Sequence, residues 1–346
     1  MINGKGIFIW KSKHCEDGSI SAIVQACKSL GLNWVTLKIG DAASQFFASF
    51  SDMPAAVAAF RAAGISVWGW HYVYGGVHLK KDGTPYNYGP TPEQEASFAL
   101  KQVHELQLAG YIVDAESQYK VFGQVERAKR FVAGIARIDV PVALCSYRFP
   151  SLHRELPWAE FLSIADLHMP QVYWGKGNAV SDLDRSMQQL SALKALPFAP
   201  VGRAYIGDGY ASPGPDRDEI RAFLLRAVER GCLAASFWSL DHLYLHDGGP
   251  ERGGAIAAFV WAGEVPPPPP DPESRPTVIG KIRVLAGALN VRAGPGAQYR
   301  DVGDLVHDTE WFVISSSGDW AQIGHGVWCK TGPGLAEWLT RYTLHE

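Results

Sequence analysis

The chain has 346 residues and a formal net charge of −3, with 47% hydrophobic and 19% charged residues. This balance is typical of a soluble globular protein with a large core, arranged as two domains or as one large and one small domain. The weak negative charge argues against a nucleic-acid partner or an anionic membrane surface, and no apolar stretch is long enough to span a bilayer.

The N-terminus and the cysteines narrow the cellular context. The apolar run Ile7-Phe8-Ile9-Trp10 is too short for a secretory signal, and Lys11 and Lys13 follow it. The five cysteines are scattered and include no C-x-x-C pair, so neither a structural zinc site nor a disulfide framework is expected. We therefore expect synthesis in the cytoplasm, buried free thiols, and no metal or cofactor.

Before residue 264, strand-like segments alternate with amphipathic segments. The predicted strands are Gly6–Trp10, Trp34–Ile39, Ser66–Tyr74, Tyr111–Ala115, Val142–Tyr147, His168–Trp174, Val201–Ile206 and Ala234–Leu240. The predicted helices are Ile20–Leu30, Met53–Ala63, Pro92–Leu108, Val121–Ile138, Trp158–Ile164, Leu183–Leu193, Asp216–Arg230 and Gly253–Trp261. Apolar strands without strict alternation are typical of a parallel sheet that is buried on both faces. About eight such units predict an α/β fold, a (β/α)8 TIM barrel over residues 1–263. The alternative is an open doubly wound sheet, although no glycine-rich phosphate loop follows the first strand.

The fourth predicted strand, Tyr111–Ala115, carries the strongest functional signal. It includes Asp114 and is followed by Glu116, and strand alternation places these two carboxylates on the same side. Repulsion between them tends to raise one pKa, so that one group holds a proton while the other stays charged, as glycosidic bond cleavage requires. A D-x-E at a strand end also occurs as a helix cap or as an ion-pair partner. Its position in the barrel favours a catalytic role over these structural ones, because active sites of this fold lie at the C-terminal ends of the strands.

Other polar and aromatic residues fall at the same ends. The predicted substrate-binding residues are Trp70, His71, Tyr72, Tyr147, Gln171, Tyr173, Trp174, Arg203, Tyr205 and Trp238. Lys38, Arg148 and Asp241 also fall at strand ends. With 12 Trp residues in the chain, a sugar-binding cleft is favoured, although any single one of these side chains can equally be core or scaffold.

A proline run, Pro266–Pro270, marks a domain boundary, with a linker over residues 264–276 and a tail over residues 277–346. The tail contains Leu289-Asn290-Val291-Arg292-Ala293-Gly294-Pro295 and Gly318-Asp319-Trp320-Ala321-Gln322-Ile323, short strands separated by turns. These motifs resemble the bacterial SH3 domain family. The resemblance implies a small all-β barrel that binds peptidoglycan or its cross-bridge peptides. An accessory domain that only stabilises or spaces the protein is the alternative.

A barrel with D-x-E on its fourth strand, joined through a proline linker to such a tail, resembles a phage or bacterial cell-wall lysin. The barrel is similar to the family 25 glycoside hydrolases, the lysozyme-type muramidases. This resemblance implies Glu116 as proton donor, Asp114 as partner carboxylate and Asp241 as the acid near the last strand. The chain departs from the family at the end of the first strand, where Ile9-Trp10-Lys11-Ser12 lacks the family's Asp.

Three hypotheses remain open at this point. The first is a monomeric hydrolase of peptidoglycan glycan strands, which acts at the cell wall after lysis or after release by another route. The second is a barrel that binds carbohydrate without cutting it. The third is a glycosidase that acts on a different polysaccharide, with the tail as a general anchor.

Overall fold

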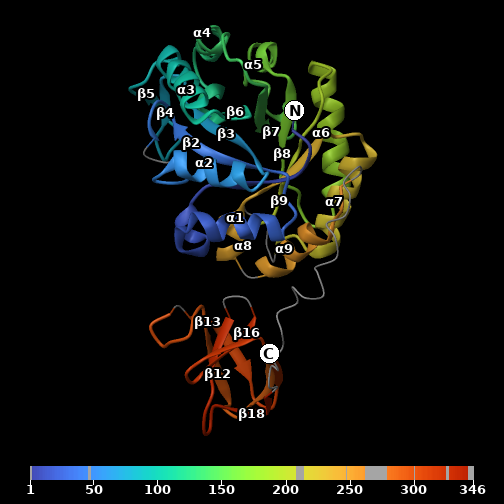
Figure 1. Ribbon diagram of the computed structural model, residues 1–346. Coiled ribbons are helices and arrows are strands. Elements are labelled where there is room, and N and C mark those ends of the chain that lie inside the picture. Colours follow the sequence, from blue (N-terminus) through green and yellow to red (C-terminus); the bar gives the residue numbers. More distant parts are fainter. Residues whose placement is uncertain are drawn as a thin grey trace. The chain divides into compact units, whose positions relative to one another are not determined.

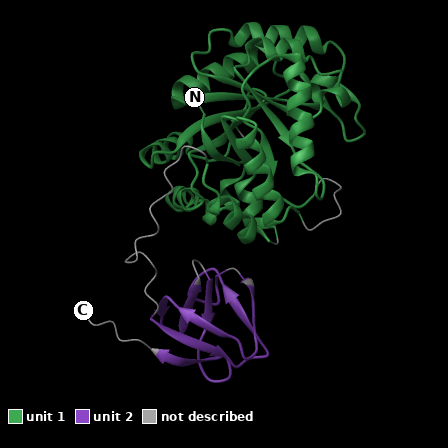
Figure 2. Cartoon of the chain, turned by 90° about the vertical axis from the view of Figure 1, so that its right-hand side faces the viewer, with its two compact units in different colours: residues 1–264 green, residues 265–346 purple. Residues whose placement is uncertain are grey.

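The computed structural model describes residues 2–45, 48–207, 214–246, 248–261, 279–299, 301–324 and 327–341. The chain divides into two compact units, Met1–Glu264 and Val265–Glu346 (Figure 2). The predicted linker, residues 264–276, lies outside the described residues. Among the described helices, none is long and apolar enough to cross a membrane.

Unit 1 is a closed barrel of parallel strands with helices around it, which confirms the predicted (β/α)8 fold and excludes the open sheet (Figure 1). The barrel strands are β1 (Gly4–Ile9), β2 (Trp34–Asp41), β3 (Ser66–Val73), β6 (Gly110–Ala115), β7 (Val142–Tyr147), β8 (Leu167–Val172), β9 (Val201–Arg203) and β10 (Ala234–Trp238). Their order around the barrel is β1-β10-β9-β8-β7-β6-β3-β2. The helices are α1 (Ile20–Ser29), α2 (Met53–Ala62), α3 (Pro92–Leu106), α4 (Gln124–Ile135), α5 (Trp158–Ile164), α6 (Ala179–Leu193), α7 (Arg217–Glu229), α8 (Leu240–Leu245) and α9 (Gly249–Ala258).

Strand alternation separates two hydrophobic cores in unit 1. Side chains such as Trp34, Trp68 and Ile112 fill the barrel interior. Their strand neighbours, among them Val35 and Val113, pack between the barrel and the helices. The same alternation continues to the C-terminal strand ends, where the inward-facing positions become polar and open a site.

Two glycines leave room for the large interior rings. A Cβ at Gly6 would lie 2.1 Å from the Trp34 ring, and a Cβ at Gly110 would lie 2.4 Å from the Trp68 ring. Any larger residue at either position would force these side chains to move. The interior is therefore packed with indoles below the level of the site.

The structure adds elements that the sequence did not predict. The strands β4 (Val77–Leu79) and β5 (Pro85–Asn87) form a separate hairpin between β3 and α3. Helix α8 lies directly after β10, where no helix was predicted. Short 3₁₀ segments also occur, including η1 (Ser12–His14), η2 (Glu16–Gly18), η4 (Ser117–Lys120) and η5 (Pro150–Leu152).

A buried arginine fixes the two loops that flank the carboxylate pair. The Arg127 guanidinium, on α4, donates to the carbonyl oxygens of Tyr74 (3.0 Å) and Gly75 (3.3 Å) after β3. It also donates to the carbonyl oxygen of Gln118 (2.7 Å) in η4, directly after Glu116. From α3, the Glu95 carboxyl accepts the N–H groups of Tyr74 and Gly75. These contacts satisfy backbone groups that would otherwise be buried without partners.

We therefore expect Arg127→Met to lower the free energy of unfolding by about 3 kcal/mol, because several buried carbonyl groups lose their donor together. Chemical denaturation followed by circular dichroism measures this loss. Arg130→Met is the matched control on α4, since the Arg130 guanidinium pairs with Glu93 at the exposed surface and should contribute far less. Equal losses in the two variants would contradict a special role for Arg127.

Unit 2 is built from two antiparallel sheets. Its strands are β11 (Gly280–Val284), β12 (Ala288–Arg292), β13 (Asp301–Val306), β14 (Glu310–Val313), β15 (Ser315–Ser317), β16 (Trp320–Gly324), β17 (Val327–Lys330) and β18 (Ala336–Arg341). The sheet orders are β14-β11-β18 and β13-β12-β17-β16-β15. Side chains from both sheets, including Ile282, Val291 and Cys329, form a small core of its own.

Candidate active site

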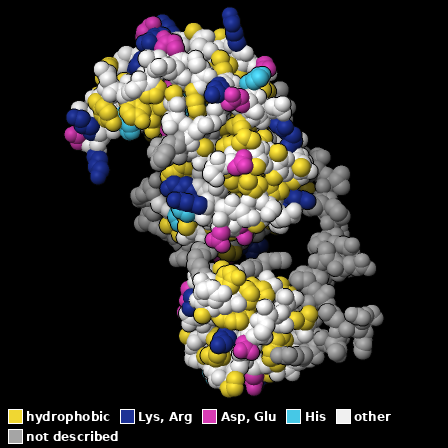
Figure 3. All heavy atoms as spheres, turned by 60° about the vertical axis from the view of Figure 1, so that its left-hand side comes forward, with side chains coloured by type: hydrophobic (Ala, Val, Ile, Leu, Met, Phe, Trp, Pro, Cys, Tyr) yellow, Lys and Arg dark blue, Asp and Glu magenta, His cyan; other side chains and the backbone are white. Residues whose placement is uncertain are grey.

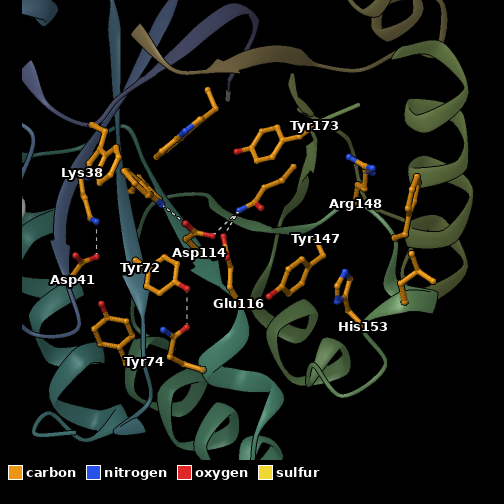
Figure 4. Close-up of a pocket in the computed structure, with 17 residues that line it drawn as sticks. Lys38, Asp41, Tyr72, Tyr74, Asp114, Glu116, Tyr147, Arg148, His153 and Tyr173 are labelled. Carbon is orange, nitrogen blue, oxygen red and sulfur yellow. Dashed lines mark hydrogen bonds and ion pairs between the residues drawn. The ribbon is translucent and has the colours of Figure 1, made fainter. Parts of the chain in front are cut away.

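A cavity of about 660 Å³ lies at the C-terminal ends of the barrel strands (Figure 4). Its lining residues are Trp10, Lys38, Asp41, Trp70, Tyr72, Tyr74, Asp114, Glu116, Gln118, Tyr147, Arg148, Phe149, Leu152, His153, Gln171, Tyr173 and Trp238. The aromatic side chains in this set provide flat apolar faces, and the two carboxylates of β6 and its extension point into the space between them. This combination of apolar walls and a few converging polar groups is typical of a ligand site.

Asp114 and Glu116 are held as one unit. The Gln171 amide, on β8, donates to Asp114 Oδ1 (3.1 Å) and to Glu116 Oε1 (2.7 Å). The indole N–H of Trp70, on β3, donates to Asp114 Oδ2 (2.7 Å). Donors from the adjacent strand β3 and from β8, which lies beyond β7, therefore fix the orientation of Asp114, while Glu116 lies nearer the opening and is only half-buried.

Burial raises the pKa of Asp114 well above its usual value, and the nearby Glu116 carboxylate raises it further. The Trp70 hydrogen bond and the positive charge of Lys38 act in the opposite direction but do not outweigh burial. The pair consequently keeps one proton to a higher pH than an isolated carboxylate would. A shared proton on two carboxyl groups in a cavity is the chemical basis for general acid catalysis.

Positive charge lies on both sides of the carboxylate pair. On β2, the Lys38 ammonium forms an ion pair with Asp41 (2.7 Å) and lies over the Trp70 ring, 4.7 Å from its centroid. Beyond Tyr147, the Lys120 ammonium donates to His153 Nδ1 (3.1 Å), and Arg148 also lines the cavity. Burial and the charge of Lys120 lower the pKa of His153, so this ring is neutral and its neighbours carry the positive charge.

The structure brings most of the predicted strand-end residues together. Eight of the thirteen predicted site residues line the cavity: Trp70, Tyr72, Asp114, Glu116, Tyr147, Gln171, Tyr173 and Trp238. The lining also includes Lys38 and Arg148, which the sequence placed at strand ends. The choice of lining residues follows strand alternation: Trp70 and Tyr72, two residues apart on β3, point the same way.

His71 and Trp174 lie outside the cavity, contrary to expectation. His71 is fully buried, contacts the Tyr111 hydroxyl (2.8 Å), and burial lowers its pKa to about 4. Trp174 is fully buried and stacks on Phe223 of α7. Each follows an inward-facing residue, so its side chain points outward into the layer between barrel and helices. Neither side chain is placed to contact a glycan.

Asp241, Arg203 and Tyr205 also lie outside the lining of the cavity. Asp241 is buried at the start of α8, where it accepts hydrogen bonds from the Ser239 hydroxyl (2.6 Å) and the Trp10 N–H (3.2 Å). Arg203 is buried and donates to the carbonyl oxygens of Trp174 (3.2 Å) and Tyr205 (3.0 Å). Tyr205 is buried edge-on against Tyr173. These residues hold the chain around the site, and the catalytic position expected for Asp241 is not supported by its location.

Seven lining residues were not predicted from the sequence. These are Trp10, Asp41, Tyr74, Gln118, Phe149, Leu152 and His153. Trp10 and Tyr74 directly follow strands β1 and β3, so inward alternation could have identified them. Asp41 is the last residue of β2, beyond the predicted end of that strand at Ile39, and the other four lie on segments beyond strand ends, whose paths depend on tertiary packing. Among the described residues, no cluster of His, Cys, Asp and Glu is arranged to hold a metal ion.

Solved structures with a similar fold include chitinases and a spore cortex-lytic enzyme. No family model and no curated protein matches the sequence. Among solved structures, active domain 2 of a thermostable chitinase from Pyrococcus furiosus has a TM-score of 0.53 at 14% identity, covering 74% of this chain and 94% of that chain. The spore cortex-lytic enzyme SleL of Bacillus cereus has a TM-score of 0.52 at 8% identity, covering 76% of each chain. A family GH18 chitinase from Cycas revoluta has a TM-score of 0.51 at 9% identity, covering 73% of this chain and 98% of that chain.

At such low identities these similarities establish a shared barrel fold. One of the three neighbours is a family GH18 chitinase, and the structural neighbours give no support to the family 25 resemblance. The bacterial SH3 resemblance of unit 2 remains a prediction.

Proposed function

We propose that unit 1 is a glycoside hydrolase that cleaves β-linked, N-acetylated glycan, and that its substrate is peptidoglycan. The observation that carries this proposal is the Asp114–Glu116 pair, bridged by Gln171 inside an aromatic cavity at the barrel's C-terminal end. The chitinase and cortex-lytic neighbours support it, because these enzymes share the fold.

In this proposal Glu116 donates the proton to the glycosidic oxygen, since it lies nearer the opening than Asp114. The proton that the pair shares is then carried by Glu116, which leaves Asp114 as the negatively charged carboxylate beside the reacting sugar. Among the described lining residues, the remaining carboxylate is Asp41, which is engaged with Lys38. We therefore assign the attack on the sugar to the substrate's own acetamido oxygen, with Asp114 stabilising the charge that develops on it.

The positive flank of the cavity favours peptidoglycan over chitin. Arg148 and Lys120 lie on the side of Tyr147 and His153, and Lys38 lies on the opposite side. Muramic acid and its peptide carry carboxylates, whereas chitin is a neutral polymer. Lys38 is paired with Asp41, and the Arg148 Nε atom lies 3.6 Å from the Asp182 carboxylate. The carboxylates of an acidic glycan could compete for these two cations, whereas a neutral polymer offers no such group.

The decisive experiment incubates the full-length protein with purified peptidoglycan and, separately, with chitin, followed by mass analysis of the released fragments. Peptidoglycan fragments with new reducing ends are the expected result. Release from chitin alone would overturn the substrate assignment but retain the hydrolase. Binding of glycan without any release would favour a non-catalytic carbohydrate-binding barrel, the second candidate function.

For unit 2 we propose binding to the cell wall. A second cavity, of about 570 Å³, is lined by Leu289, Asn290, Arg292, Pro295, Gly296, Gln298, Trp320 and Lys330 among others. It contains residues of both sequence motifs that resemble the bacterial SH3 family, and a half-buried Trp320 is suited to anchor a peptide or sugar.

A protein of residues 265–346 is expected to fold alone, because unit 2 has its own core, and to sediment with cell walls without cutting them. Trp320→Ala should weaken this binding about tenfold, the loss typical of a central aromatic contact. Co-sedimentation at several protein concentrations measures it. Retention of unit 2 in the supernatant with every wall preparation would contradict the anchoring role.

A further inference from the structure

We propose that the β4–β5 hairpin is a second carbohydrate-binding subsite, an aromatic platform that holds the glycan chain where it leaves the cavity. The platform consists of Tyr74, His78, Tyr86 and Tyr88. This inference rests on the proposed function, because it takes a longer stretch of the same polysaccharide as its ligand.

The four rings of the platform are packed into one continuous array. His78 stacks on Tyr86 with a centroid distance of 5.7 Å and an interplanar angle of 7°, and on Tyr74 at 4.9 Å and 29°. Tyr88 packs edge-on against Tyr74 at 5.4 Å and against His78 at 5.3 Å. His78 and Tyr86 are direct partners across the hairpin, so they share a face, and Tyr88 follows Tyr86 by two residues.

This array is continuous with the cavity. Tyr72 and Tyr74 both line the cavity, and their ring centroids are 5.4 Å apart. The backbone of Tyr74 is held by Glu95 on its N–H and by Arg127 on its carbonyl oxygen. The inner edge of the platform is therefore fixed in place beside the reacting groups, as a binding subsite must be.

The outer rings remain accessible to a ligand. Tyr86 is 39% exposed and Tyr88 is 37% exposed, although they belong to a closely packed aromatic group. Rings that served only to stabilise the hairpin would bury their faces against the barrel. In the space-filling view, hydrophobic side chains of the described residues gather in separate patches between charged groups (Figure 3). Aromatic faces suit the apolar C–H faces of sugar rings.

A chain of sugars longer than the cavity must pass over its rim. The hairpin lies beside η4, the segment that directly follows Glu116, so the platform is located where such a chain can continue. Its ring-lined surface complements the apolar faces of the sugar backbone, and the exposed Lys80, Lys81 and Asp82 lie at the turn of the hairpin, outside the four rings. The expected consequence is a dependence of affinity on glycan length.

The test uses the inactive Glu116→Gln full-length protein, so that binding is measured without cleavage. Titration calorimetry compares glycan strands released from peptidoglycan, in a disaccharide fraction and a long fraction. The Tyr86→Ala/Tyr88→Ala double variant should bind the long fraction about tenfold more weakly than its parent, corresponding to two stacking contacts. It should bind the disaccharide as its parent does, since the short ligand fits within the cavity.

The Tyr86→Phe/Tyr88→Phe variant retains both rings and should recover the affinity for long strands, and thermal melting verifies that the hairpin variants remain folded. Equal affinity of the alanine variant and its parent for long strands would overturn the platform while leaving the hydrolase standing. An equal loss of affinity for the disaccharide and the long fraction would also overturn the platform, because the two tyrosines would then be needed for binding within the cavity. Failure of the parent to bind any strand would instead refute the proposed function, and the platform with it.

Discussion

Glu116→Gln is expected to lower the rate of glycan cleavage by roughly 10²- to 10⁴-fold, the range attributed to a positioned general acid. Glutamine keeps the shape of the side chain, and its carbonyl oxygen can still accept the Gln171 hydrogen bond seen at 2.7 Å. What it cannot supply is the proton for the leaving oxygen. Because this interaction acts mainly in the transition state, kcat should fall while affinity for glycan is retained.

Initial rates of reducing-end release from peptidoglycan, together with binding to the same material, measure both quantities. Asp41→Asn is the matched control, because Asp41 is another carboxylate of the same cavity but is paired with Lys38 rather than with Asp114. Its cleavage rate should fall far less than that of Glu116→Gln. If Glu116→Gln cuts glycan as fast as the wild type, the proton donor has been misassigned.

The sequence predicts the barrel well because its determinants are local. Apolar strands such as Val142–Tyr147 and helix starts such as Ile20 appear directly in the hydrophobic pattern, and the structure places these elements at the same residues. The Asp114–Glu116 pair was predictable for the same reason, since two residues along a strand share a face. Its partners Trp70 and Gln171 could be proposed as strand-end residues, but their hydrogen bonds depend on strand register around the closed barrel.

The errors also have a common physical origin. Residues of both faces were assigned to the site at several strand ends, so His71 and Trp174 were included although they point away from it. Asp241 was chosen by analogy, whereas the turn into α8 directs it to Ser239 and the Trp10 backbone. The β4–β5 hairpin escaped notice because each strand is only three residues long and is rich in turn-forming neighbours. Contacts with Glu95 and Arg127 around Tyr74, distant in sequence, hold the chain at the base of this hairpin.

Asp114→Asn is expected to lower the cleavage rate on the order of 10²-fold, as removal of one electrostatic contact to a transition state does. Asparagine is close in size and can still accept the Trp70 N–H hydrogen bond, so the fold should be retained. The reaction would lose both the negative charge beside the sugar and the second carboxyl that shares the proton.

The pH profile separates this role from a structural one. Burial and the like charge of Glu116 raise the pKa of Asp114, so the wild-type pair stays singly protonated above the usual carboxyl range. Cleavage needs that proton, and the rate should therefore fall as the pH rises through the raised pKa. In Asp114→Asn the like-charge repulsion is absent and the amide holds no proton, so the alkaline limb of the pH–rate profile should move to lower pH.

Asp41→Asn should leave the alkaline limb in the wild-type position, because Asp41 is paired with Lys38 and is not a member of the bridged pair. A slow Asp114→Asn enzyme with an unmoved alkaline limb would mean that Asp114 only positions its neighbours, and that the proton used in the reaction is held elsewhere.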